Sequence, residues 1–71
     1  MEARELSSSV IARVAYDETA RAMSIDFRSG KVYVYFDVPR DVYAGLVEAP
    51  SAGGYFAANV RDVYRFERQT P

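Results

Sequence analysis

Residues 23–36 read MSIDFRSGKVYVYF, and their pattern predicts a β-hairpin. In the first half, Met23, Ile25 and Phe27 alternate with polar residues, which is the period-two pattern of a strand with one buried face. The second half is rich in valine and tyrosine, which favour strands. Gly30 lies between the halves and can adopt the positive φ angle that a tight turn requires. We therefore expect two antiparallel strands joined at residues 29–30.

The register of this hairpin decides which face carries the tyrosines. A two-residue loop at residues 29–30 pairs every apolar residue with another, giving the pairs Phe27–Val32, Ile25–Val34 and Met23–Phe36. It places Tyr33 opposite Asp26 and Tyr35 opposite Ser24, on the face away from the core. A loop longer by one residue opposes Phe27 to Lys31 and mixes the two faces, so we prefer the shorter loop.

The flanking sequence supplies one more strand and two helices. Upstream, residues 9–16 predict a strand, and a polar turn at residues 17–20 leads into the hairpin. Downstream, Pro39 favours a first helical turn, Pro50 ends that helix, and Ser51 is a natural N-cap for a second helix. The inner stripes at helical spacing are Val42, Leu46 and Ala49, then Phe56, Val60 and Val63. Residues 64–66 alternate like a short extended segment.

These elements predict an α+β fold: a three-stranded antiparallel β-meander followed by two short helices packed on one face, with a short C-terminal strand as an option. The covered face is expected to carry Val14, Met23, Ile25, Phe27, Val32, Val34 and Phe36. We expect a single domain over residues 8–67, with flexible termini at residues 1–7 and 68–71.

The composition excludes several classes of function but does not identify one. The chain has 71 residues, 49% of them hydrophobic, which allows one small core and makes a homodimer a natural way to add burial. It has no cysteine and no histidine, so disulfides, thiolate nucleophiles, imidazole bases and the usual zinc ligands are excluded. We expect no enzyme activity, no metal and no cofactor, because no acid–base couple is recognisable. A net charge of -1 gives no overall attraction to nucleic acid or anionic lipid. Without a long apolar run or a leader pattern, we expect a cytoplasmic protein that does not contact a membrane.

A series of short motifs then runs through the chain: Ser8-Ser9-x-Ile11, Tyr16-Asp17, Phe27-x-x-Gly30, Tyr33-x-Tyr35, Val38-Pro39, Ala49-x-Ser51-x-Gly53, Phe56, Val60-Arg61 and Tyr64. In this order and spacing the sequence resembles the KTSC domain family, whose marker is a central Tyr-x-Tyr. The resemblance covers residues 8–66 and departs at Ala57, where relatives often carry Asn, and at Arg65, where Pro is common. The family is named for its occurrence at the C-terminus of some lysyl-tRNA synthetases, and it also occurs as stand-alone bacterial and phage proteins. The resemblance therefore implies an association with RNA.

Three hypotheses for function remain open from the sequence. In the first, a small non-enzymatic module binds tRNA or single-stranded RNA: Tyr33 and Tyr35 stack bases, while Arg13, Arg28 and Lys31 contact phosphates. In the second, a small oligomer, such as a phage-encoded factor, binds a nucleotide-like or phosphorylated ligand with Ser51, Gly53, Gly54, Arg61 and Tyr64. In the third, the domain binds itself or another protein, with the two tyrosines central in the interface. Each set also has a structural interpretation, since strand tyrosines cover sheets and glycines permit close helix packing.

Overall fold

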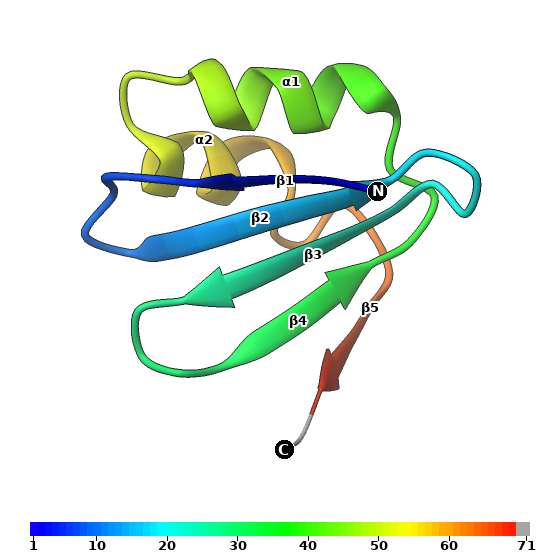
Figure 1. Cartoon of the computed structure of the whole chain (residues 1–71), viewed down its shortest axis with the longest axis horizontal. Coiled ribbons are helices and arrows are strands. Elements are labelled where there is room, and N and C mark those ends of the chain that lie inside the picture. Colours follow the sequence, from blue (N-terminus) through cyan, green and yellow to red (C-terminus); the bar gives the residue numbers. More distant parts are fainter. Residues whose placement is uncertain (70–71) are drawn as a thin grey trace.

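The spatial order of the strands follows their order in the chain. A computed structural model describes residues 1–69, and within them five antiparallel strands form one sheet in the order β1-β2-β3-β4-β5 (Figure 1). The elements are β1 (Glu2–Glu5), β2 (Ile11–Asp17), β3 (Ala22–Phe27), β4 (Val32–Tyr35), α1 (Arg40–Glu48), α2 (Ala52–Asn59) and β5 (Phe66–Gln69). The α+β class is confirmed, and the three-stranded meander gains one strand at each edge.

The two edge strands are the part of the sheet that the sequence predicted least well. β1 pairs with β2 inside the segment 1–7, for which a flexible terminus was expected. β5 pairs with β4 and includes residues 68 and 69, so the short C-terminal strand forms, but it begins at residue 66. Every residue of β1 and β5 is exposed, so neither strand carries the apolar alternation that identifies a strand in sequence. Residues 70 and 71, also expected to be flexible, lie outside the described residues.

The hairpin between β3 and β4 has the register that the sequence analysis rejected. Met23 lies opposite Tyr35, and Ile25 lies opposite Tyr33, so both tyrosines are on the core face of the sheet. The expected pairing was wrong by one residue, and a shift of one residue moves every side chain of a strand to the other face. The physical reason is burial: two tyrosine rings remove more apolar surface from water than two valines do.

The loop of this hairpin explains how the shifted register is reached. It spans the three residues 28–30, because the Phe27 N–H donates to Lys31 O at 2.9 Å and Gly30 adopts a φ of 96°. Glycine in this conformation at the end of a three-residue loop forms a bulge that suits the twist of a hairpin. Val32 and Val34 consequently lie on the outer face, not in the core as expected.

An irregularity in β2 changes which of its residues are buried. The pairing of β2 with β3 shifts between Ile11 and Arg13, so Ile11 joins Val14 and Tyr16 on the core face. Val10, which the simple alternation assigns to the same face as Val14, is 47% exposed. The irregularity lies at residue 12, between Ile11 and Arg13, and it re-aims the start of the strand.

Both helices begin where the sequence predicts. α1 follows Pro39, and α2 follows Ser51, whose Oγ accepts a hydrogen bond from the Gly54 N–H at 3.2 Å. α2 ends at Asn59, earlier than expected, so Val63 is 59% exposed and does not belong to the inner stripe. No helix within residues 1–69 is long and apolar enough to cross a membrane.

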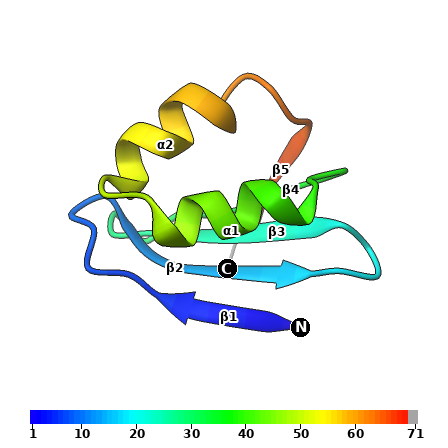
Figure 2. The same ribbon diagram turned by 90° about the horizontal axis from the view of Figure 1, so that it is seen from above.

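The helices lie on one side of the sheet (Figure 2). The buried residues of the core lie between the helices and the sheet. Tyr16 on β2 stacks against Tyr43 on α1, with ring centroids 5.2 Å apart. The Tyr16 hydroxyl donates to Val38 O at 2.6 Å, which ties the strand to the segment that leads into α1. The β2 side of the sheet thus packs against α1. The β4 side packs against α2, through Phe56 and Tyr35.

Candidate functional site

A cleft of about 360 Å³ opens on the helix side of the sheet, where β4 and β5 meet the end of α2. Its lining combines aromatic rings with charged side chains: Phe27, Ser29, Lys31, Tyr33, Tyr35, Phe56, Arg61, Asp62 and Phe66. We call it the aromatic cleft. The strand residues reach it because β3, β4 and β5 present alternate side chains to the helix side.

The rings of the aromatic cleft form a continuous, ordered surface. Tyr33 and Phe66 stack with centroids 5.3 Å apart and planes inclined by only 15°. Phe27 meets Tyr33 edge-on at 5.7 Å, and Phe56 meets Tyr35 edge-on at 5.7 Å. These spacings are the favourable offset and edge-to-face arrangements of aromatic pairs. Phe66 is 49% exposed, so the side of its ring that faces away from Tyr33 is available to another flat group.

Tyr35 forms the buried floor of the cleft and remains a neutral phenol at physiological pH. It is 3% exposed, and burial raises its pKa to about 12. The charges of Tyr33 and Asp62 act in the same direction, while Arg61 acts in the opposite one. Asp62 has a φ of 65°, an uncommon conformation for a residue other than glycine, and it turns the chain from α2 towards β5.

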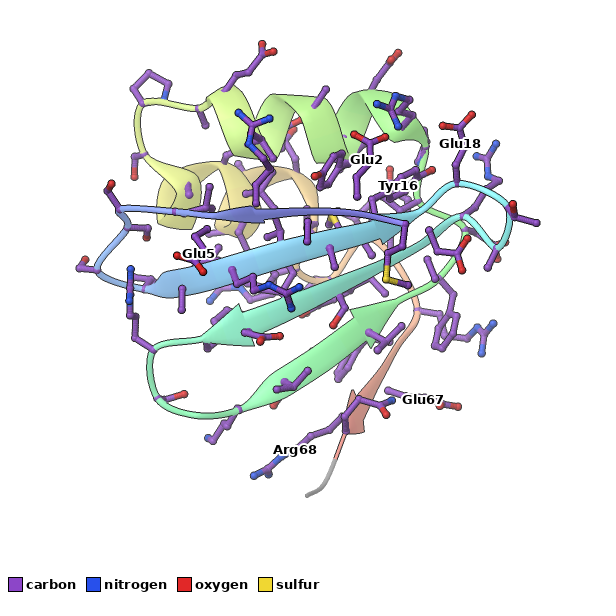
Figure 3. The ribbon with its side chains drawn as sticks, viewed as in Figure 1. Glu2, Glu5, Tyr16, Glu18, Glu67 and Arg68 are labelled. Atoms are coloured by element: carbon purple, nitrogen blue, oxygen red, sulfur yellow. The ribbon has the colours of Figure 1, made fainter. Side chains whose placement is uncertain are left out.

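Charge is distributed unequally between the two faces of the sheet. On the helix side at the β4–β5 end, Lys31, Arg61 and Arg68 outnumber the single acidic residue Asp62. The strand register places Glu5, Asp17, Asp26, Glu67 and only one basic residue, Arg13, on the outer face. Figure 3 shows Glu67 and Arg68 leaving β5 in different directions. An anionic ligand is therefore favoured on the cleft side and disfavoured on the outer side.

Comparison with known proteins places this geometry in a family. A family model described as KTSC domain matches residues 7–64. The chain belongs to the KTSC domain family. The crystal structure of a KTSC domain protein from Yersinia pestis matches with a TM-score of 0.92 and 26% identity, covering 97% of both chains. The resemblance inferred from the short motifs is thus confirmed.

Related sequences include both small proteins and parts of large ones. A protein of Tsukamurella paurometabola is 30% identical over 60 residues, covering 84% of this chain and 90% of that protein. A lysine–tRNA ligase of Nostoc punctiforme is 38% identical over 60 residues, covering 84% of this chain. The match takes up only 11% of that ligase, so the KTSC domain corresponds to a small part of it.

The fold of this KTSC domain unites part of the first predicted site and separates the rest. Tyr33, Tyr35 and Lys31 lie together in the aromatic cleft, but on the helix side rather than on the open face. Arg13 lies on the opposite face, across from Asp26. Arg28 is held away from the cleft, because its guanidinium donates to the backbone oxygens of residues 8 and 6 at 3.0 and 2.6 Å.

The second predicted set is also divided. Arg61 belongs to the aromatic cleft, whereas Ser51 and Gly53 line a second cleft beside residues 6–10. There the Ser51 Oγ is already engaged with Gly54, and Gly53 lies so close to Val10 that a Cβ would stand 3.2 Å from it. Tyr64 packs against the core as a half-buried residue. These five residues therefore do not form one ligand site.

Five lining residues of the aromatic cleft were missed as site residues, and for two of them, Phe56 and Phe66, the sequence signals pointed elsewhere. Phe56 carries a core signal, being apolar at helical spacing, and it is indeed 7% exposed while also lining the cleft. Phe66 lies in an exposed strand and comes to Tyr33 only through the pairing of β4 with β5. The alternation of residues 64–66 was the one sequence signal that could have placed Phe66 beside the hairpin.

Proposed function

We propose that this KTSC domain is a non-enzymatic module that binds single-stranded RNA by inserting an unpaired base into the aromatic cleft. The observation that carries the proposal is the stacked pair Tyr33–Phe66 beside the basic residues Lys31, Arg61 and Arg68. Flat rings next to cations are the usual means of holding unpaired bases and their phosphates. The similarity to part of a lysine–tRNA ligase supports RNA, tRNA included, as the ligand class.

In this proposal each group has a distinct task. The exposed side of Phe66 offers a surface on which a base stacks, and Tyr33 supports that ring from behind. Lys31 and Arg61 stand at the rim, where the sugar-phosphate chain would pass. The cleft volume of about 360 Å³ lies at the small end of ligand pockets, so it suits a base and its sugar rather than a duplex.

Titration of the protein with a short single-stranded RNA, followed by amide shifts, tests the proposal. Base–aromatic stacking contributes about 1–3 kcal/mol per base, so Phe66→Leu should weaken binding roughly 5- to 150-fold. Because Phe66 is half exposed, this substitution leaves the buried core intact. Arg13→Ala, on the outer face, is the matched control and should bind like the parent. Equal affinity of the Phe66→Leu variant and the parent would rule out stacking in this cleft.

Salt dependence provides a second and independent test. Three phosphate contacts from Lys31, Arg61 and Arg68 predict a slope of about −2 in a plot of log affinity against log salt concentration for a single strand. Lys31→Ala should make that slope less steep by about 0.7. Duplex RNA and free mononucleotides serve as competitors. Preference for the mononucleotide, with no dependence on strand length, would favour the small-ligand hypothesis instead.

A further inference from the structure

The edge of the sheet opposite the aromatic cleft is formed by the strand β1. Within residues 1–69, β1 pairs with β2 on one side and with no strand on the other, and all four of its residues are exposed. The Leu6 N–H donates to Ala12 O at 3.0 Å, in the same register as the β1–β2 pairing. Backbone groups of alternate residues in an antiparallel strand point to opposite sides. Glu2 and Arg4 therefore direct their backbone groups to β2, and Ala3 and Glu5 direct theirs to the free edge.

The side chains of β1 are arranged so that the strand is complementary to itself. If two copies pair antiparallel with Ala3 opposite Ala3, Glu2 of each copy lies opposite Arg4 of the other. This register also satisfies the backbone, because Ala3 has its N–H and C=O free to exchange two hydrogen bonds with its equivalent. Glu2 and Arg4 then form non-hydrogen-bonded pairs, in which opposing side chains approach most closely.

Other registers of the same edge bring like charges together. If one copy is displaced along the other by two residues, Arg4 lies opposite Arg4 or, in the other direction, Glu2 lies opposite Glu2. Like charges directly opposite each other are destabilising. The side chains are also free to respond. The Arg4 side chain forms no hydrogen bond or ion pair among residues 1–69, and Glu2 uses its Oε2 for Arg40. The Oε1 of Glu2 remains available to the Arg4 of a second copy.

The other edge of the sheet has the reverse property. When β5 pairs antiparallel with β5 of a second copy, the two-fold axis runs perpendicular to the sheet and does not exchange its faces. Residues that lie opposite each other must therefore be on the same face. Its central registers place Glu67 opposite Glu67 or Arg68 opposite Arg68. Such like-charge pairs protect an exposed edge strand from self-association. The two edges therefore differ in the charges that self-pairing brings together: opposite charges at β1 and like charges at β5. This difference favours self-pairing through β1.

We propose that two copies of this chain associate through β1 in the Ala3–Ala3 register, which joins their sheets into one continuous ten-stranded sheet. The two aromatic clefts then lie at its outer ends and stay open. β1 lies before the segment 7–64 that the family model covers. The proposal is independent of RNA binding.

Sedimentation equilibrium over a rising protein concentration, up to about 1 mM, tests the proposal, since a four-residue edge forms a weak interface. The parent chain should shift towards twice its monomer mass. Arg4→Glu and Glu2→Arg should each stay monomeric, because each places like charges at both ends of the register. An equimolar mixture of these two variants should recover the dimer, because the charges become opposite again. Arg68→Glu, a matched charge reversal on β5, should associate like the parent.

A backbone variant separates pairing from general electrostatics. Ala3→Pro removes the one N–H that faces the free edge near the two-fold axis, while the bonds to β2 remain, so it should be monomeric with an unchanged melting temperature at low concentration. In the parent, the Ala3 amide should exchange more slowly as concentration rises. A parent chain that stays monomeric at about 1 mM, a dimer that survives Arg4→Glu, or a variant mixture that stays monomeric would each overturn the proposal.

Discussion

At the scale of single residues, two stacked tyrosines differ in how their hydroxyls are satisfied. The Tyr16 hydroxyl donates to Val38 O, whereas the buried Tyr43 hydroxyl has no hydrogen-bond partner among the described residues. Removing one partner of a buried hydrogen bond costs about 1–3 kcal/mol, and removing an unpaired buried hydroxyl does not. We predict that Tyr16→Phe lowers the free energy of unfolding by at least about 1 kcal/mol and that Tyr43→Phe leaves it unchanged or raises it. Urea denaturation of both variants checks the difference, and equal losses would contradict it.

Tyr35 makes stability depend on pH in the alkaline range. Its pKa is about 12 in the folded chain because of burial, and an unfolded tyrosine ionises near pH 10. The group therefore contributes fully below pH 10, and its contribution of up to about 3 kcal/mol is lost as pH rises through 12. We predict that Tyr35→Phe flattens the fall in stability between these values. Part of the fall should remain, because burial also raises the pKa of Tyr43. A Tyr35→Phe variant with the full parental slope would show that Tyr35 is not the group responsible.

At the scale of elements, the two helices come into contact at Gly45 of α1, which has no side chain. A Cβ at Gly45 would overlap the Tyr55 ring of α2, standing 2.6 Å from its Cζ. Alanine is otherwise favoured over glycine inside a helix by about 1 kcal/mol. We predict that Gly45→Ala destabilises the parent but stabilises a Tyr55→Ala background by about 1 kcal/mol. Thermal melts of the four proteins in this double-mutant cycle give the coupling, and a stabilising effect in both backgrounds would contradict the contact.

The elements also show how far the sequence could be interpreted. The central strands and both helices were predictable because alternation, two prolines and an N-cap serine act locally. The register of the hairpin was not, because the choice between loops of two and three residues depends on which side chains the helices cover. Counting apolar pairs favoured the valines, but tyrosine packs its ring against Phe27 and Phe56 and so takes the core face. Tyrosine is both apolar and polar, so a binary pattern assigns it to the wrong class.

At the scale of the whole molecule, the same ambiguity affected the candidate site. Tyr33, Tyr35 and Lys31 were predictable because they alternate along the short segment 31–35, and the structure brings them together on the helix side. Arg13 and Arg28 followed from the assumed face, so they were lost when the register changed. Arg61 and Phe66 join the cleft only through the return of the chain from α2 to β5. Contacts between segments about 30 residues apart leave no local pattern to interpret.

β5, which forms one wall of the aromatic cleft, is held in the fold less firmly than β2. Among the described residues, β5 pairs only with β4 and is exposed throughout, whereas β2 is paired on both sides and carries Ile11, Val14 and Tyr16 in the core. Strands with little buried surface open locally, and core strands exchange through global unfolding. We predict that at low protein concentration the β5 amides exchange with an opening free energy about 2 kcal/mol or more below that of β2. A ligand that stacks on Phe66 should raise the protection of β5 selectively. Amide exchange by NMR, with and without single-stranded RNA, measures both effects, and uniform protection of β5 and β2 in the free protein would contradict this account of the edge.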